Sequence, residues 1–123
     1  MIVYRVEHLQ TGNGPYFRYD PRYKDFRDEI NGIHDDELIY PAFQLDGITS
    51  HLLFTPDFHS GFESLKDLNW WFKGFGQKLS ENNFVIAIYE VEESRVIRGD
   101  SGKQVAFDLP KAKLIRTVDR FSC

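Results

Sequence analysis

The apolar positions between residues 64 and 81 recur at the spacing of one face of an α-helix. Apolar side chains follow one another there at intervals of three and four residues, and such intervals place side chains on one side of a helix. Ser64 stands just before the series and is a favoured N-cap residue. The pattern predicts one main amphipathic helix over about residues 64–81, with a bend or a close neighbour at Gly74 and Gly76. The apolar series consists of Leu65, Leu68, Phe72, Phe75 and Leu79.

Strand patterns occupy the two ends of the chain. Residues 1–9 alternate in a way that is typical of a strand, and residues 84–91 are apolar on both faces, which is typical of a central strand. Two short runs, 96–97 and 104–107, flank a glycine-containing turn and predict a β-hairpin. Residues 113–118 predict a last strand.

The segments between these elements complete the prediction of an α+β fold. Residues 23–33 carry apolar side chains at helical spacing and predict a short helix. Residues 34–58 are interrupted by Pro41 and Pro56 and predict a long irregular loop region. We therefore expect small, mostly antiparallel sheets with one main helix, and a single domain over 1–123, because the chain is too short for two independent cores.

Composition and charge narrow the class of protein. The chain is 41% hydrophobic and 15% aromatic, which is enough for a real core, and its net charge of −4 argues against a protein that coats nucleic acid. Its one cysteine is Cys123, so no internal disulfide forms, which fits a reducing compartment. No stretch approaches the length of a membrane span, and no signal peptide precedes the first strand. We expect a cytoplasmic protein without a membrane partner.

Candidate chemistry comes from residues that lie far apart in the sequence. If the first strand and the strand at 84–91 are neighbours, polar side chains from both ends of the chain converge beside the start of the main helix. Arg5 would then lie on the floor of a cleft and hold a phosphate or carboxylate, although an ordinary surface pair between Arg5 and Glu7 explains the same residues. The candidate ligand-binding residues are Arg5, His8, Tyr16, His59 and Ser60, and the candidate catalytic residues are Glu90 and Gln104.

Other kinds of site have weaker support. The run His34, Asp35, Asp36, Glu37 resembles a metal-ligand set, but adjacent residues point in different directions, so the run alone does not form a coordination sphere. We predict no metal site. The mixture of aromatic and basic residues after Gly14 is diluted by acidic residues, so nucleic-acid binding is not expected.

Several segments together resemble a small family of phage and prophage proteins. These segments are YRVEH in the first strand, GPY, HSGFESLKDLNWWF, FVIAIYEV and GKQVAF, and they cover most of the chain outside residues 18–55. The resemblance implies a phage accessory protein that binds a host protein, a defence protein being one such target, and inhibits or redirects it in the host cytoplasm. An aromatic contact surface is expected at Tyr16, Phe17, Tyr19 and Tyr23.

More distantly, the order of motifs is similar to that of ADP-ribosyltransferase-like folds. That resemblance implies an NAD-using enzyme or a nucleotide binder, in which Arg5 contacts the phosphates or ribose and Ser60 stands at the middle motif. Gln104 falls where a carboxylate is usual, and an amide cannot stabilise an oxocarbenium-like state, so Glu90 would have to face the cleft to replace it. Whether the protein is an enzyme therefore stays open, and no cofactor is expected unless this alternative holds, in which case it is NAD.

Overall fold

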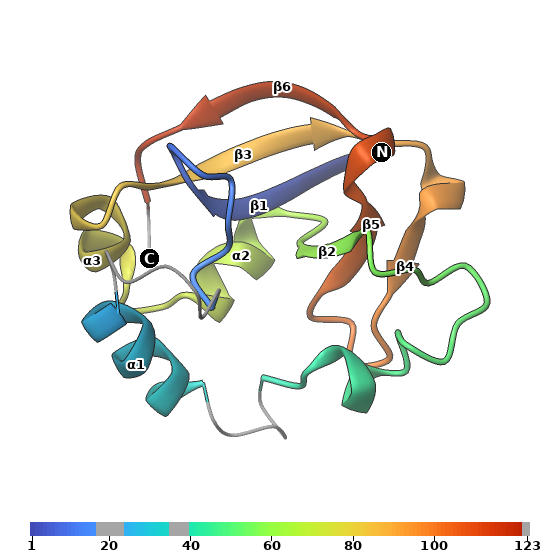
Figure 1. The fold of residues 1–123 in the computed structure, drawn as a ribbon, viewed down its shortest axis with the longest axis horizontal. Helices are drawn as coiled ribbons and strands as arrows, with labels where there is room; N and C mark the ends of the chain where they lie inside the picture. The colour runs from blue at the N-terminus through green and yellow to red at the C-terminus, as the bar shows by residue number, and fades with distance from the viewer. Residues whose placement is uncertain (17–23, 35–39, 122–123) are drawn as a thin grey trace.

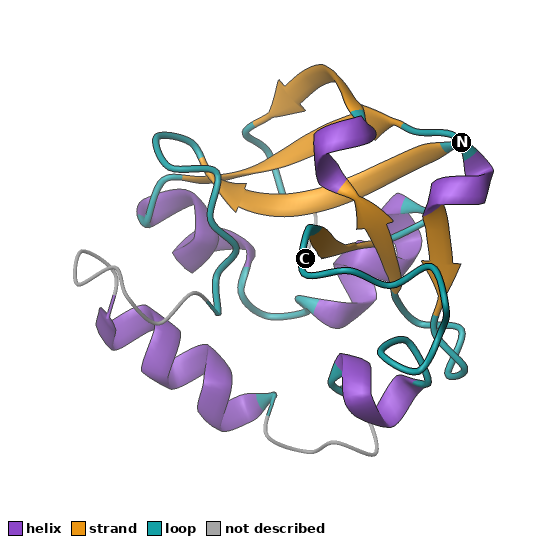
Figure 2. Ribbon diagram, turned by 45° about the vertical axis from the view of Figure 1, so that its right-hand side comes forward, coloured by secondary structure: helices purple, strands orange, loops and turns teal. Residues whose placement is uncertain are grey.

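The computed structural model describes residues 1–16, 24–34 and 40–121, and within them the chain forms three layers (Figure 1). Two three-stranded antiparallel sheets pack on one another, and the helices cover the other face of the first sheet (Figure 2). This is the α+β class that the sequence predicts. The elements are β1 (Ile2–His8), α1 (Lys24–Ile33), η2 (Phe43–Asp46), β2 (Phe58–Gly61), α2 (Leu65–Trp71), α3 (Gly76–Glu81), β3 (Phe84–Glu90), η3 (Glu93–Arg95), β4 (Val96–Arg98), β5 (Val105–Asp108), η4 (Leu109–Lys111) and β6 (Lys113–Val118), where η denotes a short 3₁₀ helix.

The first sheet has the order β1-β3-β6, and β3 is its central strand. All residues of β3 except Glu90 are buried, as its apolar sequence predicts. The prediction that the first strand and β3 are neighbours is confirmed, since Val3 pairs with Tyr89 and Val6 with Ile86 in an antiparallel register. β1 is an edge strand of this sheet, so the side of its backbone that faces away from β3 is free to contact other parts of the molecule.

The second sheet has the order β2-β5-β4. The predicted hairpin is confirmed as β4 and β5, but β2 was not predicted, because residues 59–61 look like a polar turn before the helix. Two hydrogen bonds between Tyr4 and Phe62, each 2.8 Å, join the end of β2 to β1 and so connect the two sheets. Gly61 allows this approach, since a Cβ there would lie 2.4 Å from a methyl carbon of Val3.

The main helix is two short helices, α2 and α3, where the sequence predicts one. Ser64 caps α2 as expected, and its Oγ accepts the backbone N–H of Asp67 at 3.1 Å. The helix ends at Trp71, and Gly74 follows with φ of +87°, a left-handed conformation that does not continue a helix. The bend that the glycines suggested is therefore a complete break. From Leu68 onward the apolar series still points into the core.

Two hydrophobic clusters occupy the interfaces between the layers. The helical cluster joins α1, α2 and α3 to β1 and β3 through side chains such as Phe26, Ile30 and Leu79. The second cluster lies between the two sheets and contains Tyr89 and Phe107. The described part of the predicted loop region, residues 40–58, contains η2 and a series of turns. A pocket opens where this loop, the helical layer and the edge of β1 meet.

Candidate functional site

A pocket with a volume of about 670 Å³ lies between the helical layer and the second sheet. We call it the Arg5 pocket. Strand β1 forms one side, and aromatic rings from both layers form most of the wall. No aspartate or glutamate is among the described residues that line it. The lining residues are Arg5, Val6, Gly14, Pro15, Tyr16, Asn31, His34, Tyr40, Pro41, Ala42, Phe43, Phe58, His59, Ser60, Phe62, Trp71, Phe72 and Gln104.

Five of the seven side chains that the sequence nominates line this pocket. They come from β1, the segment after it, β2 and the residue just before β5, so the fold brings together segments up to a hundred residues apart. Their functional roles stay predictions. The five are Arg5, Tyr16, His59, Ser60 and Gln104.

Arg5 is buried and held in a fixed position by the backbone around it. Its Nε donates to Glu7 Oε2 at 3.2 Å, and its Nη1 donates to the carbonyl of Ser60 at 3.1 Å. Its Nη2 lies 3.5 Å from the carbonyl of Gly12. Both interpretations of the first strand are thus partly right, because Arg5 pairs with Glu7 but does so inside the protein, at the wall of a pocket.

Glu7 balances the buried guanidinium from the side away from the pocket. The hydroxyl of Tyr89 contacts both of its carboxylate oxygens at 3.0 Å. Burial raises the pKa of the Glu7 carboxyl, while Arg5 opposes the rise, and burial also raises the pKa of Tyr89 to about 12. The guanidinium of Arg5 stays charged at neutral pH.

A second polar group lies among the aromatic rings at the helical side of the pocket. The indole Nε1 of Trp71 donates to the hydroxyl oxygen of Tyr16 at 2.9 Å, and that hydroxyl is also hydrogen-bonded to Nδ1 of His34. Burial raises the pKa of Tyr16 above its ordinary value, so the phenol keeps its proton. The other imidazole nitrogen of His34, Nε2, is buried and finds no hydrogen-bond partner in residues 1–16, 24–34 and 40–121.

The environment of His34 keeps its imidazole neutral. Rings of Tyr40, Trp71, Phe72 and Phe75 surround it, the nearest being Tyr40 at 4.2 Å between centroids. Burial lowers the pKa of His34 to about 4, although the backbone of Trp71 opposes part of the change. From sequence, His34 was considered only as the first residue of a run that resembles a metal-ligand set, and it was not among the candidate site residues. The Asp35–Glu37 part of that run lies outside the described residues.

His59 and Ser60 lie on β2, and they line the pocket from the second sheet. Ser60 contributes its backbone carbonyl to Arg5. His59 is half-buried, and both burial and the nearby charge of Arg5 lower the pKa of its imidazole, while Asp57 opposes them.

Gln104 has a structural environment that explains its position in the pocket. Its Nε2 donates to the carbonyl of Pro41 at 2.6 Å and to Asp46 Oδ2 at 3.0 Å. Asp46, fully buried, also accepts the backbone N–H of Ser101 at 2.6 Å and its hydroxyl at 3.0 Å. The amide nitrogen of Gln104 therefore attaches the loop at the pocket wall to the β4–β5 turn.

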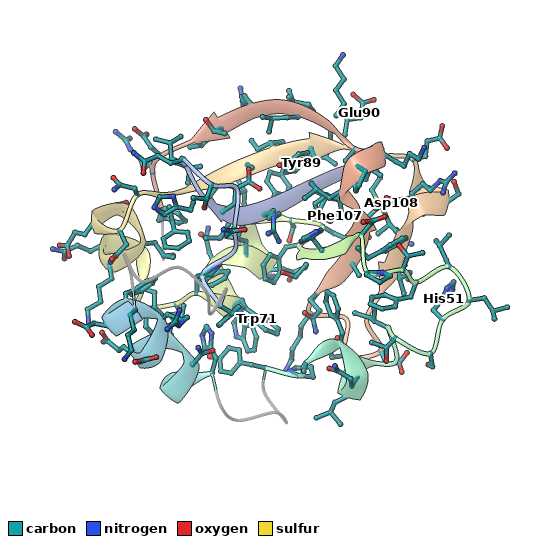
Figure 3. The ribbon with its side chains drawn as sticks, viewed as in Figure 1. His51, Trp71, Tyr89, Glu90, Phe107 and Asp108 are labelled. Atoms are coloured by element: carbon teal, nitrogen blue, oxygen red, sulfur yellow. The ribbon has the colours of Figure 1, made fainter. Side chains whose placement is uncertain are left out.

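His8 and Glu90 do not line the pocket. His8 lies at the far end of β1, where its Nδ1 accepts the backbone N–H of Gln10 at 3.2 Å and its ring meets the edge of Phe84. Glu90 is exposed at the end of β3, and Figure 3 shows it on the outer side of the first sheet, on the other side of the molecule from Trp71. The condition under which Glu90 was expected to act, that it face the cleft, is not met.

The fold and the pocket define a small α+β protein organised around one aromatic-walled site with a buried arginine. Residues 1–120 match the family model described as Bacteriophage T4 Y00F protein, and the chain belongs to that family of phage proteins. The resemblance to a small phage family is thereby confirmed. No curated protein and no solved structure matches the chain, so the more distant resemblance to ADP-ribosyltransferase-like folds has no support there. Among the described residues, no helix is long and apolar enough to cross a membrane.

Proposed function

We propose that this phage protein acts by binding a small planar ligand that carries an anionic group, a nucleotide being the class that fits best. The observation that carries the proposal is the Arg5 pocket itself. Its volume of about 670 Å³ lies in the range of small-molecule sites, roughly 300–1,000 Å³, and like such sites it combines apolar walls with a few fixed polar groups.

The wall of the pocket suits a flat aromatic ring. Tyr16, Tyr40, Trp71 and Phe72 surround the helical side, and Phe43 and Phe58 lie opposite them. Stacking of a base on such rings contributes about 1–3 kcal/mol per base and does not depend strongly on the identity of the base. A purine or pyrimidine therefore gains more here than an aliphatic molecule of the same volume.

The charge of the pocket suits an anion. A guanidinium has five N–H donors, and those of Arg5 that contact Glu7, Ser60 and Gly12 leave two for a ligand. No carboxylate among the described lining residues repels a phosphate. Because Glu7 neutralises the guanidinium from behind, the attraction is short-range and directional, as hydrogen bonds to a phosphate oxygen are.

The same geometry supports a binder over an NAD-using enzyme. The pocket presents no described carboxylate to stabilise an oxocarbenium-like state, and the amide nitrogen of Gln104 is already engaged with Pro41 and Asp46. NAD remains a possible ligand through its phosphates and rings. A phage protein of this kind would act in the host cytoplasm by removing a nucleotide from host use or by sensing it.

Calorimetry of the purified full chain tests the proposal with AMP, UMP, NAD, adenosine and inorganic phosphate. We expect at least one nucleotide to bind with a Kd tighter than about 1 mM, and AMP to bind about tenfold tighter than adenosine because only AMP reaches Arg5. Arg5→Lys keeps the charge but loses the planar fork and is expected to remove most of that difference. Arg116→Lys, on the exposed strand β6, is the matched control. Absence of binding by every nucleotide would contradict the proposal.

A second candidate function is direct binding of a host protein, which the chain would inhibit or redirect. It is supported by two exposed leucines, Leu45 in η2 at 60% and Leu52 in the loop between η2 and β2 at 103% exposure, although that loop is anchored by fully buried Ile48. The aromatic surface expected from the sequence does not supply the contact in the described residues, since Tyr16 turns into the pocket. Phe17, Tyr19 and Tyr23 lie outside the described residues.

Affinity capture from host lysate separates this second candidate from ligand binding. A tagged chain should retain a stoichiometric host protein, and Leu52→Glu should lose it without any change in thermal stability, because Leu52 contacts solvent. Leu9→Glu, which alters a leucine that is 61% exposed at the end of β1, is the control. Equal capture by both variants would exclude the loop as the contact surface.

A further inference from the structure

The hydrogen bonds around Tyr16 determine which nitrogen of His34 carries the proton. Trp71 Nε1 is only a donor, so the hydroxyl oxygen of Tyr16 accepts from it. The hydroxyl proton then needs an acceptor, and Nδ1 of His34 is the group in contact with it. Nδ1 is therefore unprotonated, and a neutral imidazole with a bare Nδ1 carries its proton on Nε2.

This arrangement leaves a buried donor without an acceptor. Among the described residues, Nε2 of His34 has no hydrogen-bond partner, and the side chain as a whole is only 9% exposed. The backbone of Trp71 is near enough to influence the imidazole but does not meet hydrogen-bond geometry with Nε2. Buried donors are nearly always satisfied in native proteins, and an exception inside a binding pocket calls for an explanation.

The surrounding rings show how an acceptor can reach this nitrogen. Water does not touch Nε2, because the rings close around the imidazole. Tyr40 is the closest ring, at 4.2 Å between centroids, and it lines the pocket but, unlike Trp71 and Phe72, is only partly buried. An imidazole N–H donates in the plane of its ring, so a flat ligand reaches Nε2 edge-on, in the plane of the imidazole, once the Tyr40 ring moves aside.

We infer that the ligand of the Arg5 pocket brings its own hydrogen-bond acceptor, a ring nitrogen or a ring carbonyl, which accepts the Nε2–H of His34 when the ring of Tyr40 gives way. The inference rests on the proposed function and makes it more specific. The ligand is recognised at two points, an anionic group at Arg5 and an acceptor atom on its planar ring at His34. A ring that presents only a donor or a C–H bond at that position is excluded, since it leaves Nε2–H unpaired.

Nitrogen NMR of the labelled full chain tests the first half of the inference without any ligand. At pH 7 we expect His34 to show a protonated Nε2 and an unprotonated Nδ1. The opposite tautomer would overturn the inference, because Nε2 would then be an acceptor and would select a donor on the ligand. This measurement gives a result whether or not the panel of nucleotides binds.

Nucleotide binding by the His34→Phe variant tests the second half of the inference, which is that Nε2–H of His34 donates to the ligand. Phenylalanine keeps an aromatic ring in the cage but has no donor, so AMP or UMP, whichever binds the wild type, should bind about tenfold more weakly. The Nε2 proton resonance of the wild type should also shift when that nucleotide is added, which a purely structural histidine would not do. Gly32→Ala on the exposed side of α1 serves as the control.

The outcomes separate the two proposals. Equal affinity of wild type and His34→Phe would overturn the inference and leave nucleotide binding intact. Failure of the wild type to bind any nucleotide would overturn the proposed function together with the inference, whatever the tautomer.

Discussion

The neutral, buried imidazole of His34 makes the protein sensitive to acid in a way that can be calculated. In the unfolded chain a histidine takes up a proton near pH 6.5, whereas burial lowers the pKa of His34 in the folded protein to about 4. Between these values the unfolded state binds more protons than the folded state, so the free energy of unfolding falls as the pH falls. Above about pH 7 neither state is protonated, and His34 adds no pH dependence.

The size of the effect follows from the same two values. One pKa unit corresponds to 1.36 kcal/mol, so a change from 6.5 to about 4 amounts to a loss of about 2 kcal/mol at pH 5 and about 3 kcal/mol at pH 4. For a domain whose total stability is about 5–15 kcal/mol, such a loss is easily measured. It is an upper value, because a folded protein can relax around the charge.

His34→Phe isolates this contribution from every other titrating group. At pH 7 the variant should be less stable than the wild type by about 1–3 kcal/mol, because the hydroxyl of Tyr16 loses its acceptor. As the pH falls, protonation of His34 lowers the free energy of unfolding of the wild type but not that of the variant. The difference in the free energy of unfolding between the two proteins therefore narrows. His59 and Glu7, whose pKa values are also shifted, titrate in both proteins and cancel in the comparison.

Urea unfolding followed by tryptophan fluorescence at pH 7, 6, 5 and 4 provides the measurement, with unfolding free energies taken from linear extrapolation. We expect the difference in the free energy of unfolding between the wild type and His34→Phe to decrease by about 2 kcal/mol from pH 7 to pH 5. A difference that stays constant to within about 0.5 kcal/mol over this range would show that His34 is not a neutral buried group. The assignment of the proton to Nε2 of His34 would then be wrong as well.

Four further substitutions, one of them a control, test the way the loop and the pocket wall are held. Gln104→Glu should lower stability by about 2 kcal/mol at pH 7, because it places a second carboxylate beside buried Asp46, and urea unfolding should show recovery on acidification as one of the two is protonated. Gly99→Ala should lower the stability of the folded protein by about 1–3 kcal/mol, since its Cβ would lie 2.0 Å from the Asp46 carboxylate. The control Gly32→Ala in α1 meets nothing within 4 Å and should raise stability by about 0.5–1 kcal/mol, and thermal unfolding distinguishes the two variants. Arg5→Met should cost about 3–5 kcal/mol in urea unfolding, because the carboxylate that it pairs with on β1 stays buried without its partner, and a loss below about 1 kcal/mol would contradict the buried pair.

The strands were predictable from sequence because the pattern of apolar and polar residues along a strand indicates which of its faces are buried. The run at 84–91 is apolar on both faces, and it is buried on both faces as β3. β2 gave no such signal, since His59, Ser60 and Gly61 form a strand only through pairing with β5 and the approach of β1. The helix had the correct buried face but not the correct length, because the backbone conformation of Gly74 decides where it ends.

The candidate site was predictable in part for the same reason. The pairing of β1 with β3 was predictable, but the contact of Arg5 with the Ser60 carbonyl depends on β2 and on the pairing of Tyr4 with Phe62, which the sequence did not indicate. His34 was not predictable, because nothing in its local sequence shows that Trp71 and Tyr16 will enclose it. Glu90 was nominated for its residue type, but the last residue of a strand faces solvent as easily as a cleft.

The pairing of β1 with β3 and with Phe62 also constrains the order in which the chain can fold. Val3 pairs with Tyr89, so β1 has to wait for the synthesis of more than eighty further residues before its partner β3 exists. Contacts of such long sequence separation slow folding, because the loop must close before the pairing contributes. The first sheet therefore assembles only after β3 has been synthesised, and a fragment that ends before β3 lacks the central strand against which β1 and the helices pack.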